Sequence, residues 1–252
     1  MNKKSRVYVS GANGNLGSEI VRRLSVTSNT EVIALKRDSR NSYIEDLLRR
    51  DDDSFIGKKV FIHCGWNVIN RTLEAQKLSV QDTEILSKIC NLRSITMIFL
   101  SSASANSESL SNYGAMKCLA EKSVSKSGGI VLRPGLVLFS SPKGIQQKLE
   151  NLSNGFVSVR FTPNISVSTI GIFDLLNVIE CILHRPDDEV GSNQLRNIFV
   201  PINTLCKPLN TTKRRVYVYI PIKLLNFVLK YLGVFNNNLA SIHDSVKSVY
   251  AR

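Results

Sequence analysis

The stretch Gly11-Ala12-Asn13-Gly14-Asn15-Leu16-Gly17 decides the fold class of this chain. A short apolar run, Val7-Tyr8-Val9-Ser10, precedes it, and Ile20, Val21 and Leu24 continue the helical spacing that begins at Leu16. This order predicts a strand, a glycine turn and a helix. Glycines let the backbone turn tightly and approach a ligand closely because no Cβ intervenes. The free N–H groups and the positive dipole end of the helix would face the turn, which predicts a pyrophosphate site.

The position of this turn near the start of the chain is typical of the opening βα unit of a dinucleotide-binding fold. Its spacing, G-x-x-G-x-x-G, is one residue longer between the first two glycines than the commonest fingerprint. The alternative interpretation is an ordinary strand-to-helix turn without a ligand. The apolar strand before it and the amphipathic helix after it favour the nucleotide site.

The bulk composition fits one large α/β domain, or a domain with a small cap, because the chain has 252 residues and 43% hydrophobic content. No apolar stretch reaches the roughly 18–20 residues of a transmembrane helix. The basic start, Met1-Asn2-Lys3-Lys4, has no apolar signal core behind it. Five scattered cysteines without a C-x-x-C pair indicate reduced thiols in the cytoplasm, with neither a disulfide framework nor a metal site.

The formal net charge of +13 is compatible with nucleic acid, a membrane surface or small anionic ligands. The tight basic cluster Lys213-Arg214-Arg215 lies beside Val216-Tyr217-Val218-Tyr219, whose alternation indicates a strand rather than a nucleic-acid platform. We therefore expect no nucleic-acid partner. A helix is also predicted at 221–232, where Lys223 and Lys230 flank an apolar run. We expect this helix to be buried in the cap or the core. Peripheral contact of this helix with a membrane stays open as an alternative.

Segments rich in Val, Ile and Phe alternate with helical patterns, which predicts a parallel sheet with helices on both faces. The predicted strands are 6–10, 31–36, 59–64, 95–101 and 129–133, and the main predicted helices are 14–24, 73–90, 113–125, 143–152 and 173–183. Right-handed crossovers make this a doubly wound parallel sheet, the Rossmann type of α/β fold. We expect residues 1–139 to form the dinucleotide-binding domain. Residues 140–252 would form a small C-terminal substrate-binding cap with elements that return to the sheet.

Ligands of such folds bind at the carboxyl ends of the strands, so the residues there carry the functional prediction. Lys36-Arg37-Asp38 follows the second strand, where dinucleotide folds read the ribose 2′ position. Lys36 and Arg37 favour the 2′-phosphate of NADP, whereas Asp38 leaves NAD open. His63-Cys64-Gly65 ends an apolar strand, and we expect His63 to hold backbone near the cofactor while Gly65 permits close approach.

A strand that ends in Ser101-Ser102 precedes Tyr113-Gly114-Ala115-Met116-Lys117. Tyr113 and Lys117 are four residues apart on a predicted helix and project from the same face. An ammonium near a phenol favours the phenolate and lowers its pKa, which suits acid–base catalysis near neutral pH. Ser102, or Ser101 in its place, could hold a substrate oxygen as its charge changes.

Together these motifs resemble the extended type of the short-chain dehydrogenases/reductases, the family of nucleotide-sugar epimerases, dehydratases and reductases. The resemblance covers residues 6 to about 139 well. The matching segments are Gly11-x-x-Gly14-x-x-Gly17, Asp46-Leu47, His63-Cys64-Gly65, Ser101-Ser102-Ala103, Tyr113-x-x-x-Lys117 and Leu132-Arg133-Pro134-Gly135-Leu136-Val137.

The resemblance implies a role for each matching segment. Tyr113 would be the acid/base, Lys117 would orient the nicotinamide ribose and tune Tyr113, and Ser102 would bind the reacting oxygen. Asp46-Leu47 would contact the adenine, and Pro134 and Val137 would lie near the nicotinamide. The segment between Arg37 and Lys59 is shorter than in typical members, which places the adenine contact and the third strand of the family in doubt.

The function implied is an NAD(P)-dependent epimerase or 4-keto reductase of a nucleotide sugar in surface polysaccharide biosynthesis. The small cap keeps open an NADPH-dependent reductase of a small non-sugar carbonyl compound. A non-catalytic NADP sensor is the third interpretation, which an intact set of Ser102, Tyr113 and Lys117 disfavours. Relatives of this type commonly dimerise through two long helices, here those at 73–90 and 113–125, so the resemblance also implies a homodimer.

Overall fold

The computed structural model describes residues 5–27, 29–35, 42–52, 54–68, 70, 72–107, 111–151, 157–164, 166–184, 195–206 and 216–221. Three groups of predictions lie outside these residues. They are the readers of the ribose 2′ position, Lys36 and Arg37 together with Asp38, the basic cluster at 213–215, and the helix predicted at 221–232 beyond Pro221.

A five-stranded parallel sheet in the order β2-β1-β3-β4-β5 forms the centre of the fold. Its strands are β1 (Ser5–Ser10), β2 (Thr30–Ala34), β3 (Lys58–His63), β4 (Thr96–Leu100) and β5 (Ile130–Leu132). The order reverses between β1 and β3, so the ends of these two strands form the switch point where ligands of such sheets bind. The expected doubly wound α/β fold is confirmed.

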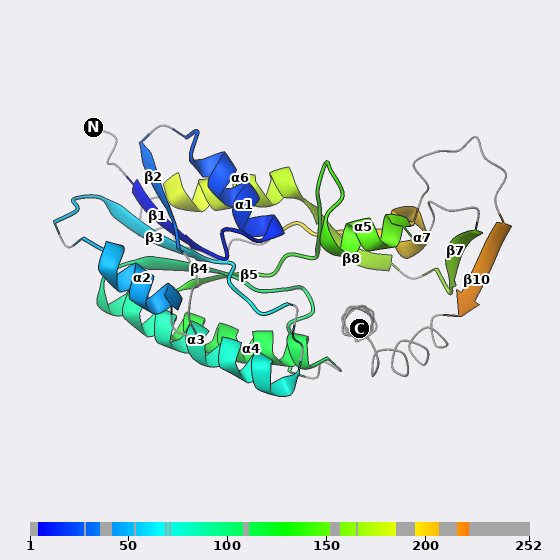
Figure 1. The fold of residues 1–252 in the computed structure, drawn as a ribbon, viewed down its shortest axis with the longest axis horizontal. Helices are drawn as coiled ribbons and strands as arrows, with labels where there is room; N and C mark the ends of the chain where they lie inside the picture. The colour runs from blue at the N-terminus through cyan, green and yellow to red at the C-terminus, as the bar shows by residue number, and fades with distance from the viewer. Residues whose placement is uncertain are drawn as a thin grey trace.

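Helices cover both faces of this sheet, as Figure 1 shows. On one face lie α1 (Asn15–Leu24) and α6 (Ile172–His184), and on the other lie α2 (Ser42–Arg50), α3 (Leu73–Leu92) and α4 (Asn112–Lys126). Alternate residues of each strand face opposite sides, so every strand contributes to two cores. Val7 and Val9 of β1 join the cluster under α1 and α6, whereas Tyr8 between them joins the cluster under the other three helices.

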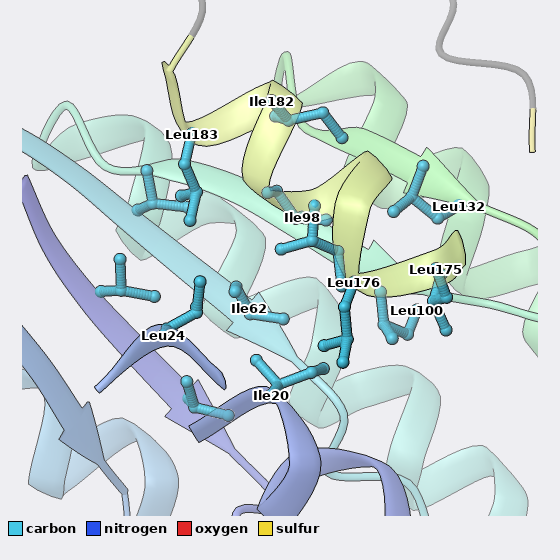
Figure 2. Close-up of a cluster of buried hydrophobic side chains, with 14 of the residues drawn as sticks. Ile20, Leu24, Ile62, Ile98, Leu100, Leu132, Leu175, Leu176, Ile182 and Leu183 are labelled. Carbon is cyan, nitrogen blue, oxygen red and sulfur yellow. The ribbon is translucent and has the colours of Figure 1, made fainter. Parts of the chain in front are cut away.

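The α1–α6 core is built from aliphatic side chains of the sheet and the two helices. Ile20 and Leu24 of α1 meet Leu175 and Leu176 of α6 over Ile62 of β3, with all five fully or almost fully buried (Figure 2). Burying one such side chain stabilises the fold by roughly 1.5–3 kcal/mol. This packing fixes α1, and with it the glycine turn, against the end of β1.

The helix α2 is an element that the sequence interpretation misses. It occupies the shortened segment between β2 and β3, where no helix is predicted above. Leu47 is fully buried against the α3–α4 side of the sheet, and Tyr43 and Ile44 are partly buried against the same core. Within the described residues, this one short helix replaces any additional strand between β2 and β3.

The residues after β5 form smaller units and one helix that packs on the main sheet. The strands β6 (Leu136–Leu138), β8 (Ser166–Gly171) and β9 (Ile198–Pro201) make a three-stranded sheet, and β7 (Val157–Thr162) pairs in parallel with β10 (Val216–Pro221). The helices α5 (Gly144–Asn151) and α7 (Ile202–Leu205) lie beside them (Figure 1). In the described part of the chain, no helix has the length and apolar character needed to cross a membrane.

Candidate active site

The glycine turn joins β1 to α1 in a conformation that requires its glycines. Gly11 has a φ of +67°, which side chains rarely adopt, and the N–H of Gly14 donates to its carbonyl oxygen at 2.9 Å. A Cβ on Gly17 would collide with the same carbonyl oxygen and lie 2.7 Å from its carbon. No side chain caps the start of α1 at Gly14, and its first turn holds no acidic residue. The N–H groups there remain suited to an anion such as a pyrophosphate.

The turn after β3 packs directly on the glycine turn. A Cβ on Gly11 would lie 2.8 Å from the carbonyl carbon of Cys64 and 2.9 Å from the nitrogen of Gly65, so the two backbones touch. The N–H of Gly65 donates to Oγ of Ser10 at 3.2 Å, which fixes the ends of β1 and β3 to each other. The close approach of a cofactor at Gly65 stays a prediction.

His63 is the internal support of these two turns. It is 2% exposed, and its Nδ1 and Nε2 lie 2.6 Å from Oγ of Ser10 and 3.1 Å from Oγ1 of Thr83. Because the Thr83 hydroxyl donates to the carbonyl of Ser79, it accepts from His63 Nε2–H, and the Ser10 hydroxyl donates to Nδ1. His63 thus joins two side-chain hydroxyls, one at the end of β1 and one on α3, and its predicted role of holding backbone near the cofactor stays a prediction. The side chain itself is enclosed by protein.

Lys117 lies in an aromatic enclosure at the end of β4. It is 3% exposed, donates to the carbonyl of Leu100 at 2.7 Å, and places Nζ 4.2 Å from the ring centroid of Trp66 and 4.4 Å from that of Phe99. Burial lowers the pKa of Lys117 to about 7, against smaller raising effects of Cys64 and Glu121. Its amine therefore changes charge near neutral pH, a property common among catalytic lysines.

Tyr113 belongs to the same enclosure. Its ring meets the indole of Trp66 edge-on at a centroid distance of 6.4 Å, and Nζ of Lys117 lies 5.9 Å from its centroid. The N-cap of α4 is Ser111, whose buried hydroxyl accepts from the N–H of Gly114, so the first turn that carries Tyr113 is well anchored. The structure thus brings Tyr113 and Lys117 together, as their spacing predicts.

The two serines after β4 differ in their surroundings. Oγ of Ser102 lies 2.8 Å from Oγ of Ser104 and accepts from its N–H at 3.2 Å. Ser101 is 6% exposed, and within the described part of the chain its buried hydroxyl has no hydrogen-bond partner. A buried hydroxyl without a partner is costly, and one at a strand end beside Lys117 is suited to a ligand oxygen.

The turn after β5 is tied to this edge by backbone bonds. The carbonyl of Pro134 accepts from the N–H of Ala103 at 2.8 Å. The side chain of Asn197 accepts from Gly135 N–H at 2.8 Å and donates to the carbonyl of Arg133 at 3.1 Å. Val137 is partly buried against the α1–α6 core. Pro134 is thus bonded to Ala103, the residue after Ser102, and its place near a nicotinamide stays a prediction.

Asp46 and Leu47 lie on α2 rather than after a strand. Asp46 is 6% exposed and forms ion pairs with Arg49 and Arg50 of the same helix. Leu47 is fully buried in the core on the α3–α4 side of the sheet. Their side chains are thus engaged by the protein, and an adenine contact from this pair stays a prediction.

Trp66 and Tyr43 are site residues to which the sequence interpretation assigns no role. Trp66 is 8% exposed, and its indole nitrogen donates to Oε1 of Gln76 at 2.7 Å, which fixes the ring beside Lys117. Its place directly after Gly65 at a strand end could have drawn attention to it. Tyr43 places its hydroxyl 3.1 Å from the N–H of Gly11, which donates to it. Nothing local in the sequence signals this contact.

No family model and no curated protein matches this sequence. Solved structures do match. The fold is similar to that of dTDP-4-dehydrorhamnose reductase from Bacillus anthracis in complex with NADP, at 14% identity over 88% of this chain and 86% of that one, with a TM-score of 0.67. It is also similar to dTDP-4-dehydrorhamnose reductase from Clostridium acetobutylicum, at 15% identity over 87% and 85% of the two chains, with a TM-score of 0.65.

UDP-glucuronic acid 4-epimerase from Bacillus cereus, solved with UDP-glucuronic acid and NAD, matches at 16% identity over 97% of this chain and all of that one, with a TM-score of 0.61. At such identities the likeness concerns the fold. The expected doubly wound α/β fold is thereby confirmed for this chain, which shares it with these reductases and this epimerase.

Proposed function

We propose that this chain is an NAD(P)-dependent enzyme of the short-chain dehydrogenase/reductase type that acts on a nucleotide-linked sugar, as a 4-epimerase or a 4-keto reductase. One observation carries the proposal. Tyr113 and the buried Lys117 lie beside Ser101 and Ser102, at the same edge of the sheet as the uncapped glycine turn. The similar structures include reductases and epimerases of nucleotide sugars, which supports the same reading.

The described residues fit a dinucleotide. The amides that follow Gly14 would hold the pyrophosphate, the contact between Gly11 and Gly65 leaves the backbone bare of Cβ atoms there, and Lys117 would meet the nicotinamide ribose. Bound nicotinamide would supply hydride transfer. We favour NADP because Lys36 and Arg37 follow the second strand, and NAD stays the alternative.

The residues of this chain would handle the proton that accompanies the hydride. When a sugar hydroxyl is oxidised, its carbon loses a hydride and its oxygen loses a proton to Oη of Tyr113, which starts as the phenolate. When a ketone is reduced, the Tyr113 phenol returns that proton to the new alkoxide. A protonated Lys117 stabilises the phenolate. The hydroxyl of Ser101 or Ser102 donates to the substrate oxygen while its negative charge develops.

The wider setting belongs to the same proposal. We place the enzyme in the cytoplasm, in surface polysaccharide biosynthesis, as a homodimer formed through α3 and α4. These helices pack on each other, and Leu73, Ile85, Leu92 and Leu119 on them are exposed apolar residues, which supports a partner surface. Light scattering after gel filtration would show a mass near that of one chain if the proposed dimer is wrong.

Contact of the C-terminal segment with membranes is a separate alternative. Co-sedimentation with anionic liposomes at low and high salt measures it.

Trp66, the single tryptophan of the chain, offers a direct test because it contacts both Tyr113 and Lys117. We expect its fluorescence to be quenched on titration with NADPH, and more weakly with NADH. Purified protein should then turn over a UDP- or dTDP-sugar in a panel that also contains simple ketones and aldehydes. Tyr113→Phe should bind NADPH normally and lose about 10²- to 10⁴-fold in turnover.

Three outcomes would redirect the proposal. Turnover of simple carbonyl compounds without any sugar nucleotide would favour a small-carbonyl reductase. NADPH binding without turnover of either class, and no effect of Tyr113→Phe in cells, would favour a cofactor sensor. Absence of quenching by NADPH and NADH alike would refute the dinucleotide site itself. Stoichiometric NADPH consumption would identify a reductase, whereas a cofactor that stays bound through gel filtration would identify an epimerase.

A further inference from the structure

Tyr43, from the unpredicted helix α2, joins both turns of the proposed dinucleotide site. Its hydroxyl accepts from the N–H of Gly11 at 3.1 Å. Its ring lies on Gly65 so closely that a Cβ there would be 2.5 Å from Cε2 and 3.0 Å from Cζ. Only a glycine at position 65 leaves room for the ring. Tyr43 is thus held at two points, on the end of β1 and on the turn after β3.

The sheet order assigns this position to one half of a dinucleotide. The Tyr113–Lys117 pair lies at the end of β4, which places the reacting end of a ligand on the β4–β5 side of the glycine turn. A dinucleotide whose pyrophosphate lies at the start of α1 must therefore extend its other half toward β2 and the helix that follows it. Tyr43 is on that helix, at the point where it touches Gly11. This assignment rests on the proposed function.

The ring of Tyr43 has the properties of a stacking surface. It is partly buried against the core on the α3–α4 side and keeps part of its surface exposed. Its orientation is fixed by the hydroxyl contact and by Gly65, so little further ordering is needed when a planar base lies on it. Stacking of a base on an aromatic side chain strengthens binding by roughly 5- to 150-fold.

We propose that Tyr43 is a specificity-determining residue of this site, whose ring stacks on the adenine base of the dinucleotide. The absence of a Cβ at Gly65 leaves the space that the Tyr43 ring occupies. The hydroxyl bond to Gly11 sets the height of the ring relative to the glycine turn, and hence the distance between adenine and pyrophosphate. The resemblance suggests Asp46 and Leu47, on the same helix, as the adenine contacts. However, the carboxylate of Asp46 forms ion pairs within the helix, and the side chain of Leu47 is buried in the core.

The test uses the two halves of NADP on the full-length protein. Isothermal titration measures the affinity for NADP, for adenosine 2′,5′-bisphosphate as the adenosine half, and for nicotinamide mononucleotide as the other half. Four variants are compared with the wild type. Tyr43→Leu removes the ring, Tyr43→Phe keeps the ring without its hydroxyl, and Gly65→Ala displaces the ring by the added Cβ. Tyr219→Leu, at a tyrosine that is 65% exposed on β10, is the matched control.

We expect Tyr43→Leu and Gly65→Ala to weaken NADP and adenosine bisphosphate by tenfold or more, and to leave nicotinamide mononucleotide within about twofold. Tyr43→Phe should lose less than threefold, and Tyr219→Leu should match the wild type. Melting temperatures measured without ligand identify any variant that fails to fold, and if Tyr43→Leu is one of them, Gly65→Ala carries the comparison.

Each contrary result has a distinct meaning. Wild-type affinity of folded Tyr43→Leu for adenosine bisphosphate, or tighter binding, would refute stacking, since the ring would then be neutral or would obstruct the base. An equal loss for both halves would make Tyr43 a support of the fold. A loss in Tyr43→Phe as large as in Tyr43→Leu would assign the effect to the hydroxyl bond. If the wild type binds neither NADP nor NAD, the proposed function fails, whatever the variants do.

Discussion

The substitution Lys117→Met probes the buried amine at the end of β4. Methionine keeps the length and apolar stem of lysine but cannot be charged. Burial lowers the pKa of Lys117 from 10.5 to about 7. Since one pKa unit corresponds to about 1.4 kcal/mol, keeping this amine charged in the folded protein costs roughly 5 kcal/mol at pH 7 and below.

The sign of the pH dependence follows from proton binding. Between about pH 7 and 10.5 the unfolded chain holds the Lys117 proton and the folded chain has released it. The free energy of unfolding of the wild type therefore rises with pH across this window, by up to about 1.4 kcal/mol per pH unit from this one group. The Met variant lacks the group. Within the range pH 7 to 9, its stability relative to the wild type should be highest at pH 7 and should fall by about 2.3 kcal/mol by pH 9, because the folded amine is still half protonated at pH 7.

Urea unfolding at pH 7, 8 and 9, followed by the fluorescence of Trp66, measures this difference. Loss of the hydrogen bond to Leu100 shifts the variant by about 1 kcal/mol at every pH and leaves the slope intact. Lys88→Met is the control, because Lys88 is an exposed lysine with a side chain 65% accessible. A difference between wild type and Lys117→Met that stays constant from pH 7 to 9 would show that the amine is charged throughout and would refute the reasoning.

Three further predictions concern the turn, the serines and a buried carboxylate. Gly17→Ala should lower the unfolding free energy by about 1–3 kcal/mol and abolish NADPH quenching, because the added methyl meets the carbonyl of Gly11; denaturant titration and fluorescence check it. Ser101→Ala should leave the fold at least as stable as the wild type and reduce turnover more than Ser102→Ala does, because the Ser101 hydroxyl is buried without a partner in the described structure; the reverse order in kcat would restore Ser102 to the leading role. Asp51→Asn should cost about 3–5 kcal/mol at pH 7 by leaving its cationic partners uncompensated, and the gap to the wild type should close as the pH falls below 3.8, since the pKa of Asp51 is lowered; acid titration by circular dichroism measures it.

The main sheet was predictable because its signals are local. Apolar runs that end in glycine or serine, alternating with helical spacing, specify β1, β3 and β4 without knowledge of their neighbours. The helix α2 was not predictable in this way. It has nine residues, and the capping-box spacing Ser42-x-x-Glu45 is a weak local signal that many non-helical segments share. Its buried residues include Asp46 and Leu47, and Tyr43 and Ile44 are partly buried against the core on the α3–α4 side. Such a short helix is stable because of tertiary packing rather than its own propensity.

In the candidate site too, the contacts between residues close in sequence were predictable, and those between distant residues were not. The Tyr113–Lys117 pair is four residues apart on one helix, so sequence spacing alone predicts its proximity. The aromatic enclosure of Lys117 comes from Trp66 after β3 and Phe99 on β4, which only the strand order brings together. The sequence thus predicts which amine would act, but its low pKa arises from contacts that are distant in the chain.

Two buried ionisable groups, Asp51 and Lys117, lie at opposite ends of the strands and differ in how far their charges are compensated. Asp51, near the start of β3, accepts hydrogen bonds from Tyr8, Lys59 and Arg93. Burial alone would raise the pKa of Asp51, but these donors outweigh it, and the pKa falls. A carboxylate that is paired with two cations and accepts a third hydrogen bond from a phenol contributes to stability and is poorly suited to exchanging protons.

Lys117 receives no such compensation among its described neighbours. Its hydrogen-bond partner is a neutral carbonyl, its ring contacts are weakly attractive, and Glu121, one turn further along α4, already forms a bidentate pair with Arg133. A protein that needed only stability would pair this amine or replace it with an apolar residue. The amine of Lys117 is buried, half protonated near pH 7 and close to the ring of Tyr113, and it lies beside the hydroxyl of Ser101, which has no partner among the described residues. This arrangement is destabilising, and it supports the acid–base role that we propose. The energetic cost of Lys117 therefore supports our proposal that the active site lies at this edge of the sheet.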